Sequence, residues 1–285
     1  MQRISNKLVL ITMLMASASA RAVIVTPDLE AVTVSGVGNT FQTVSLENTY
    51  TNAIPICTYN LPSSAAIPAV VRIDNITASS FDVKIQRAAP AGTETPGDVH
   101  CIISETGEFT QGGMHWEAGS HTPNVTSENS NWNVKAADTV TPLGTYTNPV
   151  VLHQVISHND TRWSATWAYS NTRTNPPTAT NIHVGKHVAA DTDVARVDER
   201  LGYIIAEAGS GNENGVDYEL ALGADSVRGV DDGAVSYALS STYRHGIASQ
   251  NAMDGGDGGW AVLLGGSPLA SNEIDLAIDE DTISD

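Results

Sequence analysis

Short stretches of the chain alternate between apolar and polar residues with a period of two, the pattern of half-buried β-strands. Asn, Gly, Ser and Pro stand between them and favour turns. Six short strands within about 90 residues are typical of an antiparallel sandwich rather than of alternating strands and helices. A tight hairpin is predicted at residues 75–80. The strands predicted in the first part of the chain are residues 42–46, 53–59, 69–76, 80–86, 99–105 and 114–118.

The same pattern recurs along the chain. Thr-Tyr pairs begin at residues 49, 145 and 242, so they are spaced by 96 and 97 residues. A repeat of this length predicts an all-β protein of tandem six-stranded antiparallel β-sandwich modules. Module 1 is predicted at residues 23–122, module 2 at 130–224 and a partial module 3 at 225–285.

The third module is expected to be incomplete. By the spacing of the first two modules, its last two strands would lie beyond Asp285. An unfinished sandwich exposes a bare strand edge that invites pairing. Three explanations stay open: the natural sequence is longer, a strand from a partner completes the module, or the module is poorly ordered.

Residues 1–20 have the composition of a secretory signal peptide. Arg3 and Lys7 give a positive start, residues 8–15 are apolar apart from Thr12, and residues 18–20 form a small-residue cleavage site. The apolar run is shorter than the roughly 20 residues that a bilayer span needs. We therefore expect a secreted protein without membrane insertion, with an N-terminal membrane anchor as the alternative.

The two cysteines, Cys57 and Cys101, are expected to form a disulfide in an oxidising compartment, because two cysteines allow only one pairing. Two free buried thiols are the alternative. A closed loop of about 45 residues would stabilise the fold by about 4 kcal/mol. The matching positions in module 2 are His153 and Tyr203, so the bond is an addition to module 1 rather than a requirement of the repeat.

The charge balance excludes some partners. Lys and Arg number 14 against 32 Asp and Glu, which gives a net charge of −18, and basic residues do not cluster. Such a chain has no electrostatic attraction for nucleic acid or for an anionic membrane. Hydrophobic residues make up 41% of the sequence and charged residues only 16%, so the chain has enough apolar surface to build cores and is not expected to be disordered.

The hairpin segment at residues 71–85, with Asn75-Ile76-Thr77 at its turn and Phe81, Val83 and Ile85 after it, resembles the H-type lectin domain; residues 52–56 before it and 99–103 after it extend the likeness. The resemblance implies a six-stranded antiparallel sandwich that binds N-acetylgalactosamine and related sugars, often as a trimer. Three tandem copies would then imitate that trimer within one chain.

The family commonly has a Trp soon after this strand. Here residues 87–90 follow Gln86 without an aromatic residue, so no sugar-contacting residue is transferred from the family.

The loop between the second and third predicted strands differs most among the modules, as expected of a binding loop on a constant scaffold. Sugars are recognised by an aromatic ring face and by charged or amide groups that take vicinal hydroxyls. Trp163 and Trp260 could instead open the third strand and fill the core. Exposed rings would favour a lectin and buried rings a scaffold. The candidate carbohydrate-binding residues are His158, Asp160, Arg162 and Trp163 in module 2 and Asp254, Asp257 and Trp260 in module 3.

The segment from Asp254 to Gly259 is also a weak candidate for calcium. Asp254 and Asp257 offer hard oxygen ligands, the glycines leave room for carbonyls, and Asp279, Glu280 and Asp281 follow in the sequence. Two aspartates three positions apart fall short of an EF-hand loop, and a glycine-rich turn is favoured. No other cofactor is indicated.

No catalytic motif stands out in the sequence, so we expect a non-enzymatic protein. The leading hypothesis is a secreted, multivalent carbohydrate-binding protein whose partners are glycans or a polysaccharide. The alternative is an extracellular structural or adhesive repeat that self-associates and binds no sugar.

Overall fold

The computed structural model describes residues 8–13, 23–129 and 131–283. They form short β-strands and two single-turn 3₁₀ segments, η1 (Ala136–Asp138) and η2 (Val230–Asp232), so the predicted all-β class is confirmed. The structure contains no helix long and apolar enough to cross a membrane within these ranges.

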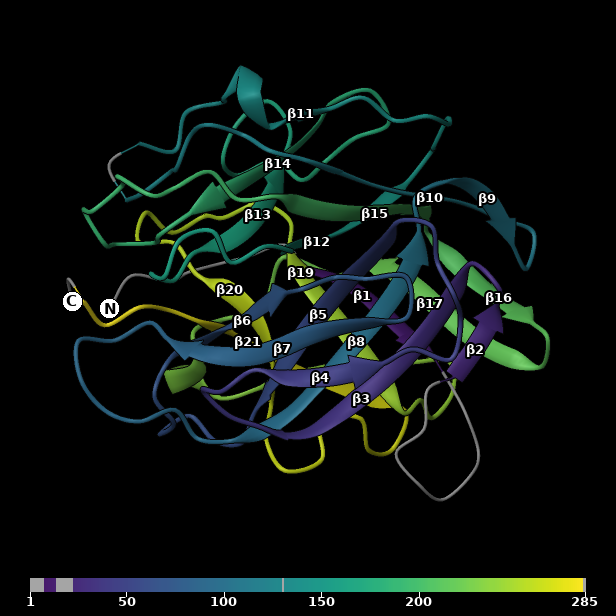
Figure 1. The fold of residues 1–285 in the computed structure, drawn as a ribbon, viewed down its shortest axis with the longest axis horizontal. Coiled ribbons are helices and arrows are strands. Elements are labelled where there is room, and N and C mark those ends of the chain that lie inside the picture. Colours follow the sequence, from purple (N-terminus) through teal and green to yellow (C-terminus); the bar gives the residue numbers. More distant parts are fainter. Residues whose placement is uncertain (1–7, 14–22, 130, 284–285) are drawn as a thin grey trace.

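The strands fall into three sets with the same order of neighbours (Figure 1). Each set has a group of four strands and a group of three, and neighbouring strands within a group are antiparallel. The group of three in set 3 and the group of four in set 1 form one seven-stranded sheet, because β20 pairs with β5 in parallel. The four-stranded orders are β5-β8-β3-β2, β12-β15-β10-β9 and β19-β1-β17-β16, and the three-stranded orders are β4-β7-β6, β11-β14-β13 and β18-β21-β20.

Set 1 follows the alternation of the sequence closely. Strand β7 buries every second residue, because Phe81, Val83 and Ile85 point into the core. The predicted hairpin at 75–80 is confirmed, with Asn75 at φ 49° in its turn. The strands of set 1 are β2 (Val23–Thr26), β3 (Leu29–Val37), β4 (Gln42–Ser45), β5 (Ala53–Leu61), β6 (Ala69–Asp74), β7 (Ser80–Arg87) and β8 (Gly97–Glu105).

Set 2 repeats this order. The strands of set 2 are β9 (Gly107–Gln111), β10 (Met114–His121), β11 (Thr139–Val140), β12 (Pro149–Val155), β13 (Ala165–Tyr169), β14 (Ile182–His187) and β15 (Leu201–Glu207). Its pairing differs from the predicted module boundaries, because β9 and β10 were assigned to module 1 but β10 is hydrogen-bonded to β15. Likewise β16 and β17, predicted within module 2, belong to the sheet of set 3. The alternation identifies a strand but not its neighbour.

The chain passes from one set to the next at two glycines in equivalent positions. Gly107 follows β8 with φ 128°, and Gly209 follows β15 with φ 153°. These backbone conformations are nearly closed to residues with a Cβ. The turn therefore redirects the chain into the neighbouring sheet after a single residue, Thr106 or Ala208.

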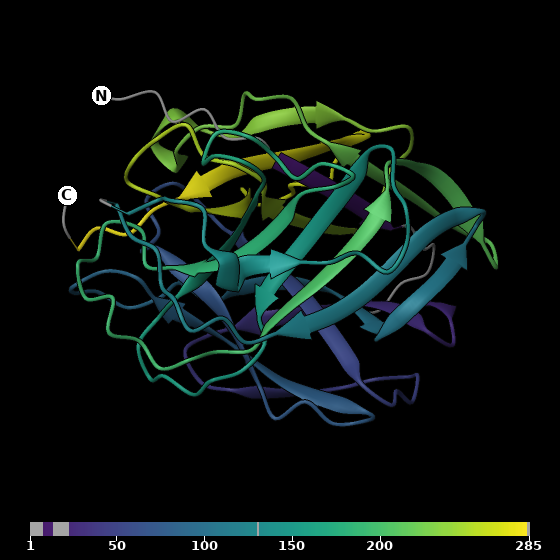
Figure 2. The ribbon, with the colours of Figure 1, turned by 90° about the horizontal axis from the view of Figure 1, so that it is seen from above.

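Set 3 contains a strand from the other end of the chain. The strand β1 (Leu8–Met13) lies between β17 and β19, the position that β8 and β15 hold in the other sets. Figure 2 shows it in purple among the green and yellow strands of set 3. The other strands of set 3 are β16 (Gly209–Glu213), β17 (Val216–Leu222), β18 (Val235–Ala238), β19 (His245–Gln250), β20 (Trp260–Leu264) and β21 (Glu273–Asp279).

This position of β1 corrects the expectation that module 3 lacks two strands. One of the two belongs to the following set in each repeat, and β1 fills the place of the other. Residues 8–13 were also predicted as part of a signal peptide; the remaining residues of that segment, including the predicted cleavage site at 18–20, lie outside the described residues.

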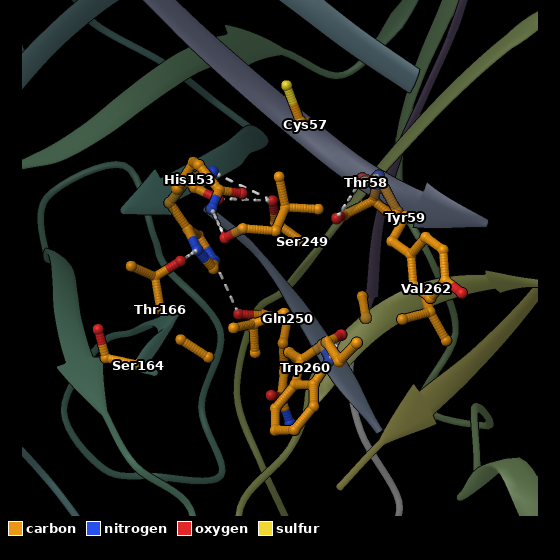
Figure 3. A pocket seen from close by; sticks show the side chains of 17 residues that line it. Cys57, Thr58, Tyr59, His153, Ser164, Thr166, Ser249, Gln250, Trp260 and Val262 are labelled. Atoms are coloured by element: carbon orange, nitrogen blue, oxygen red, sulfur yellow. Dashed lines mark hydrogen bonds between the residues drawn. The ribbon is translucent and has the colours of Figure 1, made fainter. Parts of the chain in front are cut away.

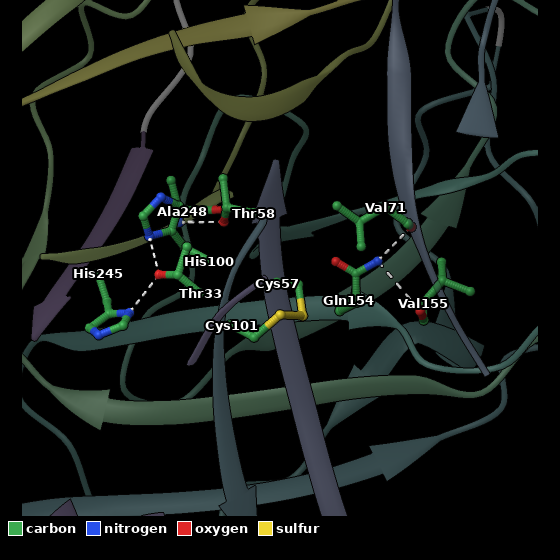
Figure 4. Close-up of a disulfide and its surroundings, with 10 residues drawn as sticks. All are labelled: Thr33, Cys57, Thr58, Val71, His100, Cys101, Gln154, Val155, His245 and Ala248. Atoms are coloured by element: carbon green, nitrogen blue, oxygen red, sulfur yellow. Dashed lines mark hydrogen bonds between the residues drawn. A yellow bond between two sulfur atoms is a disulfide. The ribbon is translucent and has the colours of Figure 1, made fainter. Parts of the chain in front are cut away.

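The strands β5, β12 and β19 meet at the centre of the molecule, and their residues are buried apart from the half-buried Asn60. Buried side chains join the sets in a cycle. Thr58 donates to the carbonyl of Ala248 at 3.0 Å, Asn251 to that of Val151 at 2.9 Å, and Gln154 to that of Val71 at 3.0 Å. Figure 4 shows the first and the third of these bonds. The three sets therefore share one interior, which fixes how the connecting loops meet.

Candidate functional site

The predicted sugar-binding residues of module 2 lie in the loop between β12 and β13. Arg162 binds Asp160 through two bonds, with Nε 3.0 Å from Oδ1 and Nη2 2.8 Å from Oδ2. Its Nη1 donates to Asp193 at 2.6 Å. The hydrogen bonds from Arg162 hold the pKa of Asp160 well below its usual range. The two groups best suited to sugar hydroxyls are therefore paired within the protein.

A fully buried ion pair anchors this loop to set 1. Arg72 on β6 lies 2.7 Å from Glu199, and neither side chain is exposed. Arg72 also donates to the carbonyl of Asp160 at 3.1 Å, and Glu199 accepts the backbone N–H groups of Asn159 and Asp160 at 3.0 Å each. Burial lowers the pKa of Arg72, and the carboxylate of Glu199 opposes that shift. The pair was not predicted from the sequence, although Arg72 is a charged residue within the apolar run 69–73.

The two candidate tryptophans are buried. Trp163 is 5% exposed and Trp260 7%, and their ring centroids lie 5.5 Å apart. The Trp260 indole donates to the carbonyl of Ala69 at 3.0 Å, so it also ties set 3 to set 1. Both rings pack as the structural alternative predicted, and neither offers a face to a sugar.

His158 lies at the boundary of sets 1 and 2, half-buried. Its ring meets that of Phe41 edge to face at 5.2 Å, and the Lys84 ammonium covers the Phe41 ring at 4.6 Å. Burial, with the charges of Arg72 and Lys84, lowers the pKa of His158. The Nε2 atom of His158 is buried and has no hydrogen-bond partner in the described part of the chain.

The candidate residues of module 3 do not form a cation site. Asp257 accepts a hydrogen bond from Asn129 at 3.1 Å, and the carbonyl of Asp254 accepts one from Arg173 at 2.8 Å. No cluster of three or more His, Cys, Asp or Glu side chains suited to a metal occurs in the described ranges. A Cβ at Gly258, which has φ 84°, would lie 2.7 Å from the backbone of Ala189. Close packing of the chain therefore accounts for this glycine.

The acidic residues that follow are used elsewhere. Asp279 accepts the N–H of Ala69 at 3.1 Å, and Asp281 accepts that of Ala190 at 2.7 Å. Burial raises the pKa of Asp279 to about 7. Both carboxyl groups join set 3 to another set rather than to Asp254 or Asp257.

The predicted disulfide between Cys57 and Cys101 is present, and it joins directly opposite residues of β5 and β8 (Figure 4). His153 and Tyr203 face each other in the same way on β12 and β15. The positions that match in the sequence are therefore also equivalent in the two sheets. Beside the disulfide, Thr33 lies 3.1 Å from His100 and 2.8 Å from His245.

A polar cavity of about 40 Å³ lies where the three sets meet (Figure 3). His153 donates through Nε2 to the carbonyl of Gln250 at 2.9 Å, and its Nδ1 lies 2.8 Å from the hydroxyl of Thr166. Burial lowers the pKa of His153 to about 4, so the ring is neutral. Gln250 lines the cavity, and its side-chain amide has no protein partner. The space suits one or a few water molecules rather than a sugar.

A larger groove of about 530 Å³ lies between sets 2 and 3. Its apolar floor is formed by Pro149, Leu220 and Leu222, and Leu222 is 40% exposed. None of the lining residues in the described ranges is aromatic. The groove therefore suits an apolar peptide segment better than a pyranose.

Comparison of this chain with protein-family models, with curated proteins and with solved structures finds no match. The likeness of residues 71–85 to the H-type lectin domain thus stays a prediction from the sequence.

Proposed function

We propose that this protein is a non-enzymatic extracellular scaffold with a structural or adhesive role, and that it binds no sugar through the loops at 158–163 and 254–260. One observation carries the proposal. All Trp, Tyr and Phe residues of the chain lie in the described ranges, and each is buried or partly buried. Carbohydrate stacking needs an accessible ring face, so the buried rings favour the scaffold over the lectin.

The joints between the sets also support a scaffold. The Arg72–Glu199 pair joins sets 1 and 2, the two tryptophan rings join sets 2 and 3, and Asp279 joins sets 3 and 1. Each joint is at least nine-tenths buried at its contacts. Buried polar contacts fix the positions of the sets relative to one another, because breaking one contact leaves an unpaired polar group in the interior.

Tryptophan fluorescence tests the sugar-binding alternative. The chain is titrated with N-acetylgalactosamine, galactose and a sulfated polysaccharide, each with and without calcium. We expect no saturable change, since Trp163 and Trp260 pack against each other. A saturable change that Arg162→Ala abolishes and Arg87→Ala retains would restore the lectin hypothesis and contradict the scaffold.

Calorimetry tests whether the three sets act as one body. Because buried hydrogen bonds join all three sets and a buried ion pair joins sets 1 and 2, we expect a single transition in which the calorimetric and van't Hoff enthalpies agree. Two or three separate transitions would show independent modules and contradict a rigid scaffold.

A further inference from the structure

The sheet of set 3 depends on a strand that the chain supplies from far away in the sequence. Residues 9–13 of β1 pair with β17, from Val9 with Leu222 to Met13 with Tyr218. Residues 8–13 pair with β19, from Leu8 with Gln250 to Met13 with His245. Both pairings are antiparallel, so β1 satisfies strand edges on two sides.

The place of β1 cannot stay empty at low cost. Strand β19 is buried along its whole length, and within the described ranges β1 is the only strand paired with it. Without β1, several buried N–H and C=O groups of β19 lose their partners, at about 1 to 3 kcal/mol each. Set 3 must therefore keep β1, take another strand or open.

The connection of β1 to the rest of the chain is unlike that of its counterparts. The strands β8 and β9, and likewise β15 and β16, are separated by one residue, whereas Met13 and Val23 are separated by nine. Those nine residues contain the small-residue cleavage site at 18–20 that the sequence analysis predicted. Cleavage at that site during export would separate β1 from the rest of the chain.

We propose that the space between β17 and β19 is a strand-acceptor site, in which an extended aliphatic segment of a partner protein replaces β1 after the N-terminal segment is removed. The proposal deepens the scaffold function, because it names the means by which the scaffold joins its partner. β1 itself defines the ligand as about six residues, all apolar except one Thr, antiparallel to both neighbours.

The acceptor site is continuous with the surface. Leu220, Ala221 and Leu222 pair with β1, and the same three residues line the groove of about 530 Å³ between sets 2 and 3. An incoming strand can therefore enter from this end, and an apolar side chain at the start of the strand has a place to bind.

The test uses the full chain with a specific protease site inserted between residues 17 and 18. The chain is folded, cut and mixed with a fluorescent peptide that carries residues 8–13 between lysines, and anisotropy reports uptake. We expect one peptide per chain after cutting and none before. The same peptide with Leu10→Pro should bind at least about tenfold more weakly, because proline removes a ladder donor.

A matched cut controls for nonspecific opening. Inserting the site in the exposed loop at 91–95 leaves β8 attached through β9 and through the disulfide. We expect no uptake of the β1 peptide by this chain. Uptake equal to that of the first cut chain would overturn the proposal.

A second arm removes the possibility that β1 dissociates too slowly. The cut chain is unfolded in urea, freed of β1 and refolded with or without the peptide, and hydrogen exchange reports on β17 and β19. We expect slow exchange in both strands only with the peptide. Slow exchange without any peptide, or no uptake in either arm, would overturn the proposal.

Two further outcomes distinguish the strand-acceptor proposal from self-association of the chain and from failure of the scaffold function. If the freed chain associates with itself and the peptide reverses this, the occupant is a second copy, and the assignment to a different partner is overturned. If the cut chain takes up the peptide but a sugar also binds in the fluorescence titration, the scaffold function fails while the acceptor site stands.

Discussion

Strands β8 and β1 occupy the same position in sets 1 and 3, yet they are secured differently. β8 follows β7 along the chain and is bonded to β5 through Cys57 and Cys101. β1 comes from the other end of the sequence and carries no covalent link to β17 or β19. The neighbouring strands therefore define the place of a strand in its sheet, while the covalent connections of that strand decide how firmly it is held there.

A proline in each central strand gives the largest expected contrast. Ile102→Pro in β8 should prevent folding, because its N–H lies within a buried sheet and cannot be replaced. Leu10→Pro in β1 should release that strand and open only set 3, because β17 and β19 lose their shared partner. Hydrogen exchange measures both, and rapid exchange beyond set 3 in Leu10→Pro would contradict the comparison.

The buried ion pair between Arg72 and Glu199 tests the joint between sets 1 and 2. In both of these sets the strand equivalent to β1 directly follows the preceding strand of its own set in the sequence. Arg72→Met should lower the free energy of unfolding by about 3 to 5 kcal/mol, because Glu199 stays buried without its partner. Urea unfolding measures the loss. The double variant Arg72→Met with Glu199→Gln is the control and should recover part of it; a loss below about 1 kcal/mol in the single variant would contradict the assigned role.

Removing the disulfide takes away the covalent advantage of β8. The variant Cys57→Ala with Cys101→Ala should lose about 2 to 4 kcal/mol, since its unfolded chain is no longer cross-linked. Urea unfolding with the reduced wild type as control checks this. Equal stability of variant and oxidised wild type would show that strand pairing alone secures β8.

Acid should lower the free energy of unfolding, because buried histidines lie in all three sets near the centre of the molecule. Burial lowers the pKa of His100, His153 and His245 to about 4 and that of His187 to about 3. Below pH 6.5 these histidines bind protons in the unfolded chain but stay neutral in the folded chain. The free energy of unfolding therefore falls as the pH is lowered toward 4.

Three carboxyl groups oppose this loss. Burial raises the pKa of Asp138 to about 6 and of Asp279 to about 7, and it also raises that of Glu30, so the folded chain binds protons there. The net expectation is a loss of about 1 to 3 kcal/mol per pH unit between pH 6 and 4.5. Urea unfolding across this range measures it, and constant stability would contradict neutral buried imidazoles.

The smallest effect is expected at the surface. Arg162→Ala should lower the melting temperature less than any variant above, because this ion pair is partly open to water. Thermal unfolding against Arg87→Ala as a control measures it. A loss as large as that of Arg72→Met would show that the loop, rather than the buried pair, holds sets 1 and 2 together.

Much of set 1 was predictable because its pattern is local. All six strands predicted in the first part of the chain are present, although the sixth, β10, pairs in set 2. The disulfide of Cys57 and Cys101 was predicted, and the matching residues His153 and Tyr203 face each other in set 2, because opposite residues keep their spacing in a repeat. The strands β2 and β3 of set 1, however, were not predicted.

The rest depends on contacts between distant parts of the chain. Glu199 lies 127 residues from Arg72, and no pattern in a local window joins them. The burial of Trp163 and Trp260 follows from how the sets meet, which the alternation of one strand does not contain. The place of β1 was missed for the same reason, since residues 8–15 have the composition of a leader.

The turns at Gly107 and Gly209 have a consequence for the order in which the chain can supply its strands. The strand β1 precedes β2 as β8 precedes β9 and β15 precedes β16, so the strands form a cycle with no privileged starting point. A circular permutant that begins at Gly107, carries a linker between Asp285 and Met1 and ends at Thr106 should build the same sheets. In such a permutant the β1 strand would lie inside the chain, tied to β21 on one side and β2 on the other.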